Sequence, residues 1–127
     1  MIPDDEVLAR FVLFERWIRN DNTVKPDAFI PPYGSTPNLS VTRHIGLSNS
    51  QIWEIGRGVA ATRQLPLHGR ADTECSVVKS QELTVSPAPL CDNQNHANII
   101  GWPTSKPEQK IKALEIAKMA VFSGHDV

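Results

Sequence analysis

Apolar residues recur at helical spacing in the middle of the chain, directly after a strong helix-start signal. Ser48 followed by Gln51 forms a capping box, in which the two side chains bond backbone N–H groups that the first turn leaves free. The apolar positions that follow share one helical face: Ile52, Ile55, Val59 and Ala60. We therefore predict a helix from about Asn49 to Thr62. Gly56 and Gly58 weaken this helix intrinsically, which suggests close packing against a sheet.

A second long helix is predicted near the end of the sequence. Ser105 and Glu108 form another capping box, and Pro107 fits the first turn. The buried stripe that follows consists of Ala113, Ile116, Ala117, Ala120 and Val121. We predict that this helix continues until Ser123-Gly124 stops it. Earlier in the chain, Asp72 is placed to cap a brief helix carrying Cys75, Val77 and Val78.

Strand signals have two forms in this sequence. The segments 39–43 and 83–85 alternate apolar and polar residues, which is typical of a half-buried strand. The run 10–18 carries bulky residues at both odd and even positions, which favours a strand buried on both faces. An amphipathic helix is the alternative. Ile99 and Ile100 are strongly β-prone, and Pro103 forbids continuation of a central strand.

Prolines concentrate between Thr23 and Asn38, where four of the ten are found. They exclude a regular helix, so we expect an irregular loop over about residues 20–38, a length typical of functional or mobile loops. The order of elements is then β-loop-β-α-β-α-β-β-α, counting a short extended piece near residue 69. It predicts an α+β fold: a small mixed or antiparallel sheet of about four to five short strands, with two main helices and one short helix packed on it.

Composition places the chain among ordinary soluble proteins. Its 127 residues, 40% hydrophobic and 21% charged, predict one globular domain spanning residues 1–127. The net charge of −1 gives no general attraction to nucleic acids or anionic membranes, so nucleic-acid binding would need a local patch. The acidic N-terminus is unlike a signal peptide, and no apolar run is long enough to span a bilayer. We therefore expect a cytoplasmic protein without membrane contact.

Histidines and arginines lie at the ends of predicted strands. His44 follows Arg43, His68 lies two residues before Arg70, and His96 precedes the last apolar run. If these strands are neighbours with the same ends together, the side chains converge on one cleft. Imidazoles that titrate near neutral pH, together with arginines that hold an anion, suit phosphodiester cleavage or phosphoryl handling. This pattern gives one hypothesis, in which His68 and His96 act as acid and base while Arg43 and Arg70 hold phosphate.

Several polar neighbours extend this list of binding candidates. Asn95 and Asn98 flank His96, and His44 stands beside Arg43. Asp72 could orient a histidine while Arg70 binds an anion; an Arg–Asp pair in which Asp72 caps the next helix is the favoured reading.

Metal and cofactor sites are not favoured by the sequence. A zinc site built from Cys75, Cys91 and His96 would lack the closely spaced ligand pairs of structural zinc sites. The glycines are scattered and form no phosphate-binding loop, and no nucleophile elbow is present. We therefore predict no metal and no cofactor, with the cysteines as reduced thiols.

The proline-rich loop is the favoured interaction element. It carries Phe29 and Tyr33, and aromatic residues frequently dominate protein interfaces. Trp53 and Trp102 are better explained as covering the core. The leading hypothesis is therefore a binding or accessory protein that acts on a protein partner through residues 23–38 and the arginine-bearing strand ends. The alternative is a metal-independent nuclease or phosphoryl-handling enzyme, for example of toxin type.

Four short motifs together resemble those of small uncharacterised single-domain bacterial proteins. The motifs are Val24-Lys25-Pro26-x-Ala28-Phe29, Leu39-Ser40-Val41-x-Arg43, Gly69-Arg70-Ala71-Asp72 and His96-Ala97-Asn98-Ile99-x-Gly101-Trp102-Pro103. The resemblance covers essentially the whole chain. It implies a bacterial, cytosolic setting and a single domain, and it carries no activity.

Overall fold

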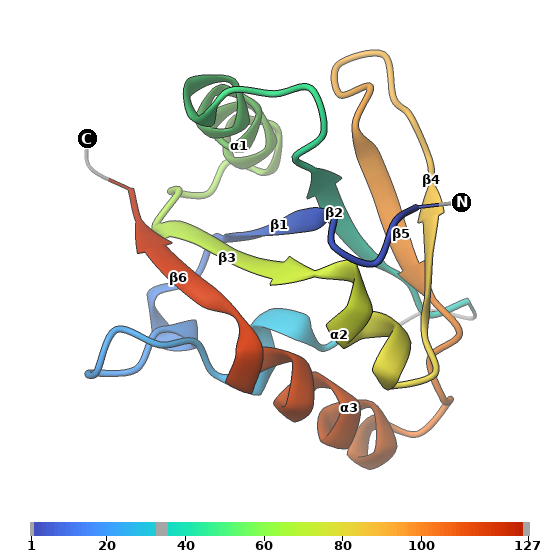
Figure 1. The fold of residues 1–127 in the computed structure, drawn as a ribbon. Helices are drawn as coiled ribbons and strands as arrows, with labels where there is room; N and C mark the ends of the chain where they lie inside the picture. Colours follow the sequence, from blue (N-terminus) through green and yellow to red (C-terminus); the bar gives the residue numbers. More distant parts are fainter. Residues whose placement is uncertain (1, 33–35, 126–127) are drawn as a thin grey trace.

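A computed structural model describes residues 2–32 and 36–125. Its centre is a six-stranded antiparallel sheet with the strand order β4-β5-β2-β1-β3-β6 (Figure 1). The strands are β1 (Val7–Val12), β2 (Leu39–Arg43), β3 (Gly69–Glu74), β4 (Thr84–Pro87), β5 (His96–Ile100) and β6 (Val121–Gly124). The predicted α+β class is confirmed, and the sheet has more strands than the four to five expected.

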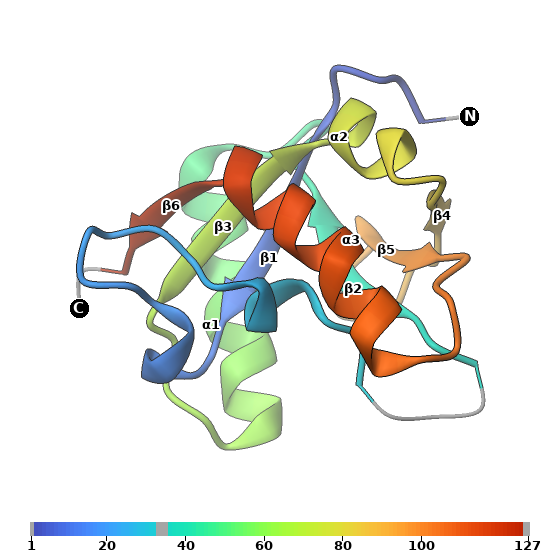
Figure 2. The same ribbon diagram turned by 90° about the horizontal axis from the view of Figure 1, so that it is seen from below.

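Helices cover both faces of the sheet. Helix α1 (Asn49–Arg63) lies on one face, while α2 (Cys75–Ser80) and α3 (Lys106–Met119) lie on the other (Figure 1). Figure 2 shows the short 3-10 helix η2 (Pro26–Phe29) alongside α3. A second 3-10 helix, η1, covers Glu15–Trp17. The described chain therefore forms three layers with the sheet in the middle.

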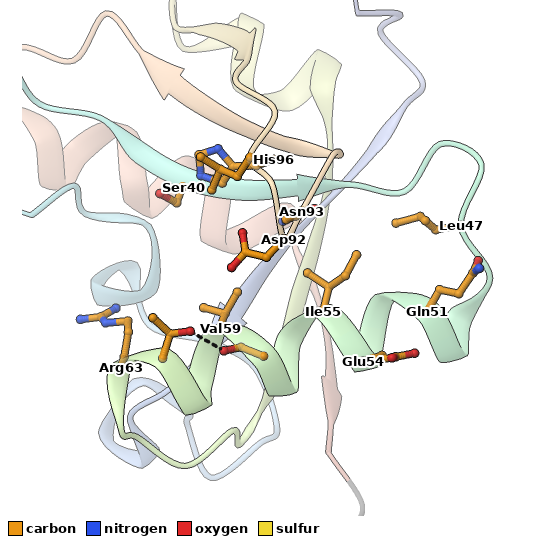
Figure 3. Close-up of a pocket in the computed structure, with 13 residues that line it drawn as sticks. Ser40, Leu47, Gln51, Glu54, Ile55, Val59, Arg63, Asp92, Asn93 and His96 are labelled. Atoms are coloured by element: carbon orange, nitrogen blue, oxygen red, sulfur yellow. Dashed lines mark hydrogen bonds between the residues drawn. The ribbon is translucent and has the colours of Figure 1, made fainter.

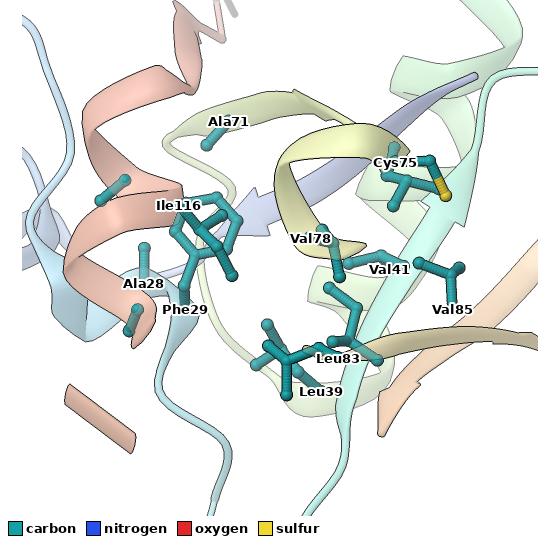
Figure 4. Packing of buried hydrophobic residues seen from close by; sticks show 14 of the residues in the cluster. Ala28, Phe29, Leu39, Val41, Ala71, Cys75, Val78, Leu83, Val85 and Ile116 are labelled. Carbon is teal, nitrogen blue, oxygen red and sulfur yellow. The ribbon is translucent and has the colours of Figure 1, made fainter. Parts of the chain in front are cut away.

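The core is divided by the sheet into two clusters. On the α3 side, Phe29, Leu39 and Ile116 are among the fully buried residues of the larger cluster (Figure 4). On the α1 side, a smaller cluster joins β1 to the helix through Ala9, Phe11, Leu13, Ile52 and Ala60. Strand β1 supplies both clusters, since successive side chains of a strand point to opposite faces.

The first strand is shifted relative to its prediction. The expected burial on both faces is confirmed for β1, but the strand covers residues 7–12 rather than 10–18. Beyond it, the chain turns into η1, and the backbone N–H of Lys25 donates to the Trp17 carbonyl. The Phe14 and Trp17 rings meet edge to face, with centroids 4.8 Å apart. This local aromatic packing replaces the predicted continuation of the strand.

Both long helices begin where their caps predicted. Ser48 and Gln51 form both bonds of the capping box of α1, and the Ser105 hydroxyl accepts from the Glu108 N–H at the start of α3. The end of α3 was predicted too late. The helix stops at Met119, Ala120 is extended, and residues 121–124 form β6 on the edge of β3. Pairing with β3 satisfies this backbone in place of a further helical turn.

Two smaller expectations near these elements are settled by the structure. Asp72 lies within β3, and α2 begins after Glu74, so the prediction that Asp72 caps this helix is wrong. Residues 20–32 and 36–38 are mainly irregular as expected, apart from η2, which starts at Pro26; the rest of this predicted loop lies outside the described residues. Within residues 2–32 and 36–125, no helix is long and apolar enough to cross a membrane.

Candidate functional site

The two histidines proposed as acid and base lie at opposite ends of the sheet. His96 pairs with Thr42, which in turn pairs with Ala9, whereas His68 lies just beyond the Gly69–Val12 pair. Three strand spacings and four residues along the strands separate the two positions, which amounts to roughly 20 Å. Strands β3 and β5 run in opposite directions, so their first residues cannot meet. A mechanism in which both imidazoles act on one bond does not fit this arrangement.

Arg70 and Asp72 join His44 in a partly buried network. The Nε2 atom of His44 lies 3.2 Å from Asp72 Oδ1, and Arg70 Nε donates to Asp72 Oδ2 at 3.2 Å. Arg70 also donates to the Asn49 side chain at the start of α1, and its guanidinium lies 4.8 Å from the centre of the Trp53 ring. Only 6% of Arg70 is exposed. The favoured Arg–Asp pairing is present, and Arg70 is held inside the fold.

Arg43 is also engaged within the protein. Its Nε and Nη2 atoms donate to the two carboxylate oxygens of Glu6 at 2.6 and 2.9 Å. This fork-to-fork hydrogen bonding raises the pKa of Arg43 above its usual value. Neither arginine presents a free guanidinium at the surface. The arginine-bearing strand ends therefore do not form the exposed contact surface expected from the sequence.

The two asparagines beside His96 have different roles. The Asn95 side chain donates to the carbonyls of Arg43 and Ile45 at 2.8 and 2.7 Å, so it fixes the exit of β2. Asn98 lies within β5 opposite Ser40 and is half-buried. Asn95 is therefore a structural residue, while Asn98 remains on the sheet face that α1 only partly covers.

A cleft opens between α1 and the loop that joins β4 to β5 (Figure 3). Its volume is about 570 Å³. The walls combine apolar residues from both sides with several polar groups: Leu47, Ile55, Val59, Leu90, Ser40, Gln51, Glu54, Thr62, Arg63, Asp92, Asn93 and His96. Figure 3 shows Asp92 and His96 facing α1 across the cleft, with Glu54 and Arg63 toward opposite ends of the helix.

His96 has a fixed orientation in this cleft. Its Nδ1 atom lies 2.8 Å from the Ala88 carbonyl oxygen, which can only accept a hydrogen bond. The proton is thereby assigned to Nδ1, and Nε2 is left with a lone pair. His96 can accept a proton or a hydrogen bond at Nε2. Of the sequence candidates that the structure describes, His96 alone lines the cleft. The carboxylates of Glu54 and Asp92 were missed because they look like ordinary surface charges.

A second hollow lies where the proline-rich segment meets the start of α3. It has a volume of about 710 Å³ and is formed by Arg16, Trp17, Asp27, Ile30, Pro31, Pro32, Lys106, Pro107 and Lys110. We call it the proline groove. Phe29, predicted to be an exposed anchor, is 0% exposed and belongs to the core, so this prediction is wrong. Tyr33, the other predicted anchor, lies outside the described residues.

Arg10 is a partly buried cation that sequence reasoning missed. Its Nε donates to the Ala28 carbonyl at 2.8 Å, and its Nη1 donates to the Ser40 carbonyl at 3.1 Å. Burial, and secondarily the nearby positive charge of Arg63, lowers the pKa of Arg10 to about 10. Arg10 thus bridges β2 and η2 where β1 and β2 are no longer paired.

Neither cysteine belongs to a described cluster of side chains that could hold a metal ion. Cys75 is buried and Cys91 is exposed, and burial raises the pKa of the Cys75 thiol, which keeps it protonated. Among residues 2–32 and 36–125, no group of three or more His, Cys, Asp or Glu side chains could hold a metal ion.

Comparison with known proteins identifies no relative of this chain. No family model, curated protein or solved structure matches this chain. A functional assignment therefore depends on the contacts and charges of the surfaces described above.

Proposed function

We propose that this protein is a binding module that holds an acidic, extended segment of a partner protein in the proline groove. The observation that carries the proposal is the composition of this groove. Apolar rings and side chains form its walls, namely Trp17, Ile30, Pro31, Pro32 and Pro107. Tryptophan in a hollow is a frequent anchor point in protein interfaces.

The groove is held in shape by internal contacts. Lys106 donates to the Pro31 carbonyl at 2.5 Å, which ties the start of α3 to the proline-rich segment. Phe29 packs into the core directly beside this segment, near Ile116 of α3 (Figure 4). A preformed groove costs less conformational entropy on binding than a disordered loop. Part of the segment predicted as the interaction element, from Asp27 to Pro32, thus forms one wall of the groove.

The charged residues that line the groove indicate which kind of segment it binds. Arg16, Lys106 and Lys110 line the groove, and among the lining residues that the structure describes Asp27 is the one carboxylate. The local excess of positive charge favours a segment with Asp or Glu side chains, although the whole chain has a net charge of −1. The apolar walls accommodate one large apolar side chain of that segment. An acidic peptide with a single apolar anchor fits both features.

The test measures binding of fluorescent peptides that carry Phe between acidic residues, with matched basic peptides for comparison. The double variant Arg16→Glu/Lys110→Glu should bind the acidic peptides roughly tenfold more weakly, because two attractive charges become repulsive. The matched control is Lys118→Glu on the same helix, whose exposed pair with Glu115 contributes little to stability. Equal binding of acidic and basic peptides, or equal losses in variant and control, would contradict the proposal.

A second candidate is the enzyme hypothesis with His96 alone as the acid–base residue. It is favoured by the open Nε2 atom of His96 in a cleft that also contains Asp92. General acid–base groups contribute about 100-fold or more to a rate. If this candidate holds, the purified protein cleaves RNA or DNA, and His96→Ala reduces the rate by at least about 100-fold. His68→Ala is the control, and it should leave cleavage unchanged. Equal cleavage by wild type and His96→Ala would remove His96 from the mechanism.

A further inference from the structure

The cleft between α1 and the loop that joins β4 to β5 has walls that internal hydrogen bonds hold in place (Figure 3). In the loop, Leu90 and Asn93 exchange two backbone hydrogen bonds of 2.9 and 3.1 Å. The buried Asn93 side chain also donates to Thr42 Oγ1 of β2 at 3.0 Å, which ties the loop to the sheet. The cleft volume of about 570 Å³ lies within the range of about 300–1,000 Å³ that is usual for small-molecule sites.

Apolar side chains line the cleft from both sides. Ile55 and Val59 lie one turn apart on α1, and Leu90 belongs to the loop. Leu90 is one of the large apolar residues that the fold leaves exposed, with 47% of its surface accessible. A ligand with an apolar body would remove these side chains from water, which is favourable in proportion to the apolar area covered.

Gly58, in the middle of α1, gives independent evidence for a ligand. A Cβ atom at Gly58 would meet no neighbouring atom of the described chain within 4 Å, whereas at Gly56 it would come within 2.6 Å of the Phe11 ring. Glycine costs a helix about 1 kcal/mol relative to alanine, and close packing inside the protein accounts for this cost only at Gly56. Because Gly58 lines the cleft, its missing side chain lets a ligand approach the helix backbone closely.

The polar groups on the loop side of the cleft are hydrogen-bond acceptors. His96 donates from Nδ1 to the Ala88 carbonyl at 2.8 Å, so its Nε2 atom has a lone pair and cannot donate. The Asp92 carboxylate can only accept, and Figure 3 shows Asp92 and His96 both facing α1. Within the part of the chain that the structure describes, neither the Asp92 carboxylate nor His96 Nε2 has a donor as its partner. These two acceptors match a ligand group with a positive charge and several N–H donors.

The charges around the cleft also favour a cation. Among the described lining residues are two carboxylates, Glu54 and Asp92, and one guanidinium, Arg63. Figure 3 shows Arg63 toward one end of α1 and Glu54 toward the other. The positive charge of Arg63 is therefore set apart along the helix, and the charges of the lining sum to a negative value. Such a balance attracts a cationic ligand.

We propose that this cleft binds a small organic amine with an apolar body. The ammonium group supplies one positive charge and up to three N–H donors for the Asp92 carboxylate and His96 Nε2. The apolar body lies against Ile55 and Val59, over the backbone that Gly58 leaves uncovered. The cleft is on the opposite face of the sheet from α3, so this site is separate from the proline groove.

The experiment follows backbone NMR signals of the whole chain at neutral pH during titration with phenethylamine, 2-phenylethanol and phenylacetate. The three probes share one ring and differ in the charge of the end group. Signals of Ile55, Val59 and Asp92 should shift together and saturate with the amine. Phenethylamine should bind at least about threefold more tightly than the alcohol, because it adds a charge-assisted hydrogen bond at a partly solvated site. Phenylacetate should bind most weakly.

Two variants test the two ends of the proposed ligand. Asp92→Asn, at an exposed position, should weaken amine binding about three- to tenfold and leave alcohol binding unchanged. Gly58→Leu should weaken binding of both probes at least about tenfold without lowering the thermal midpoint, because its side chain enters the cleft and meets no neighbour. The matched controls are Asp5→Asn and Ala61→Leu, at exposed positions outside the cleft lining, and both should change the affinity less than about twofold.

Four outcomes of these titrations would overturn the proposal. They are the absence of saturable shifts in the millimolar range, equal binding of amine and alcohol, equal affinities of Asp92→Asn and Asp5→Asn, and wild-type binding by a folded Gly58→Leu protein. An RNA oligonucleotide provides a further comparison. If the oligonucleotide shifts the cleft signals and phenethylamine does not, the cleft belongs to the cleavage candidate and the amine proposal is wrong. None of these results depends on whether acidic peptides bind the proline groove.

Discussion

Phe29→Ala should lower the free energy of unfolding by about 3–5 kcal/mol, the range typical for removing a large buried aromatic side chain. Phe29 is fully buried between the sheet and α3, and Figure 4 shows it beside Ile116. The variant removes contacts with the larger core cluster and leaves a cavity that rigid neighbours cannot fill. Urea unfolding followed by tryptophan fluorescence measures the loss.

The control for this prediction is Ile111→Ala on the exposed face of α3. Ile111 is 64% exposed, and surface truncations of this kind usually change stability by less than about 0.5 kcal/mol. The comparison also separates two roles of Phe29. If Phe29→Ala retains wild-type stability and loses only peptide binding, then Phe29 is an exposed anchor and its placement in the core is incorrect.

Gly69→Ala should destabilise the protein by about 3 kcal/mol by displacing β6 from β3. Gly69 pairs with Val12 on one side and Gly124 on the other. A Cβ atom at this position would clash with the Ser123 carbonyl oxygen and lie 2.6 Å from the Phe122 ring. Backbone of a paired strand cannot give way as a flexible side chain can. Thermal unfolding should show a clearly lowered midpoint.

Gly58→Ala is the matched control within the same molecule. A Cβ atom at Gly58 meets no neighbouring atom within 4 Å, and alanine favours the helix by about 1 kcal/mol over glycine. This variant should therefore be more stable than wild type. A Gly69→Ala protein as stable as Gly58→Ala would show that β6 does not pack as tightly on β3 as the structure indicates.

The two helix glycines show how far local sequence reasoning extends. Both suggested close packing of α1 on the sheet. At Gly56 this is confirmed, because a Cβ atom would come within 2.6 Å of the Phe11 ring. Gly58, only two residues later, faces open space and lines the cleft that contains His96. Residues two apart in a helix point about 200° apart, so the same helix turns Gly56 toward the sheet and Gly58 away from it.

The candidate sites show a second limit on what can be predicted from the sequence. Positions at the ends of strands were readable from the sequence, but the direction of each strand was not. Because β3 and β5 are antiparallel, His68 and His96 lie at opposite ends, whereas His44 reaches Asp72. Glu54 and Asp92 appeared as ordinary polar residues until their neighbours in space were known. No local pattern marks a residue that gains its role from a distant segment.

The sequence by itself determined the α+β class, the starts of both long helices and the irregular proline-rich segment. These features depend on caps, periodicity and proline geometry, which act between residues close in the chain. The tertiary structure decided the remaining features. It placed Phe29 in the core, paired Arg43 with Glu6, and turned residues 121–124 into an edge strand. Each of these depends on contacts between residues far apart in the sequence, where burial and pairing outweigh local preference.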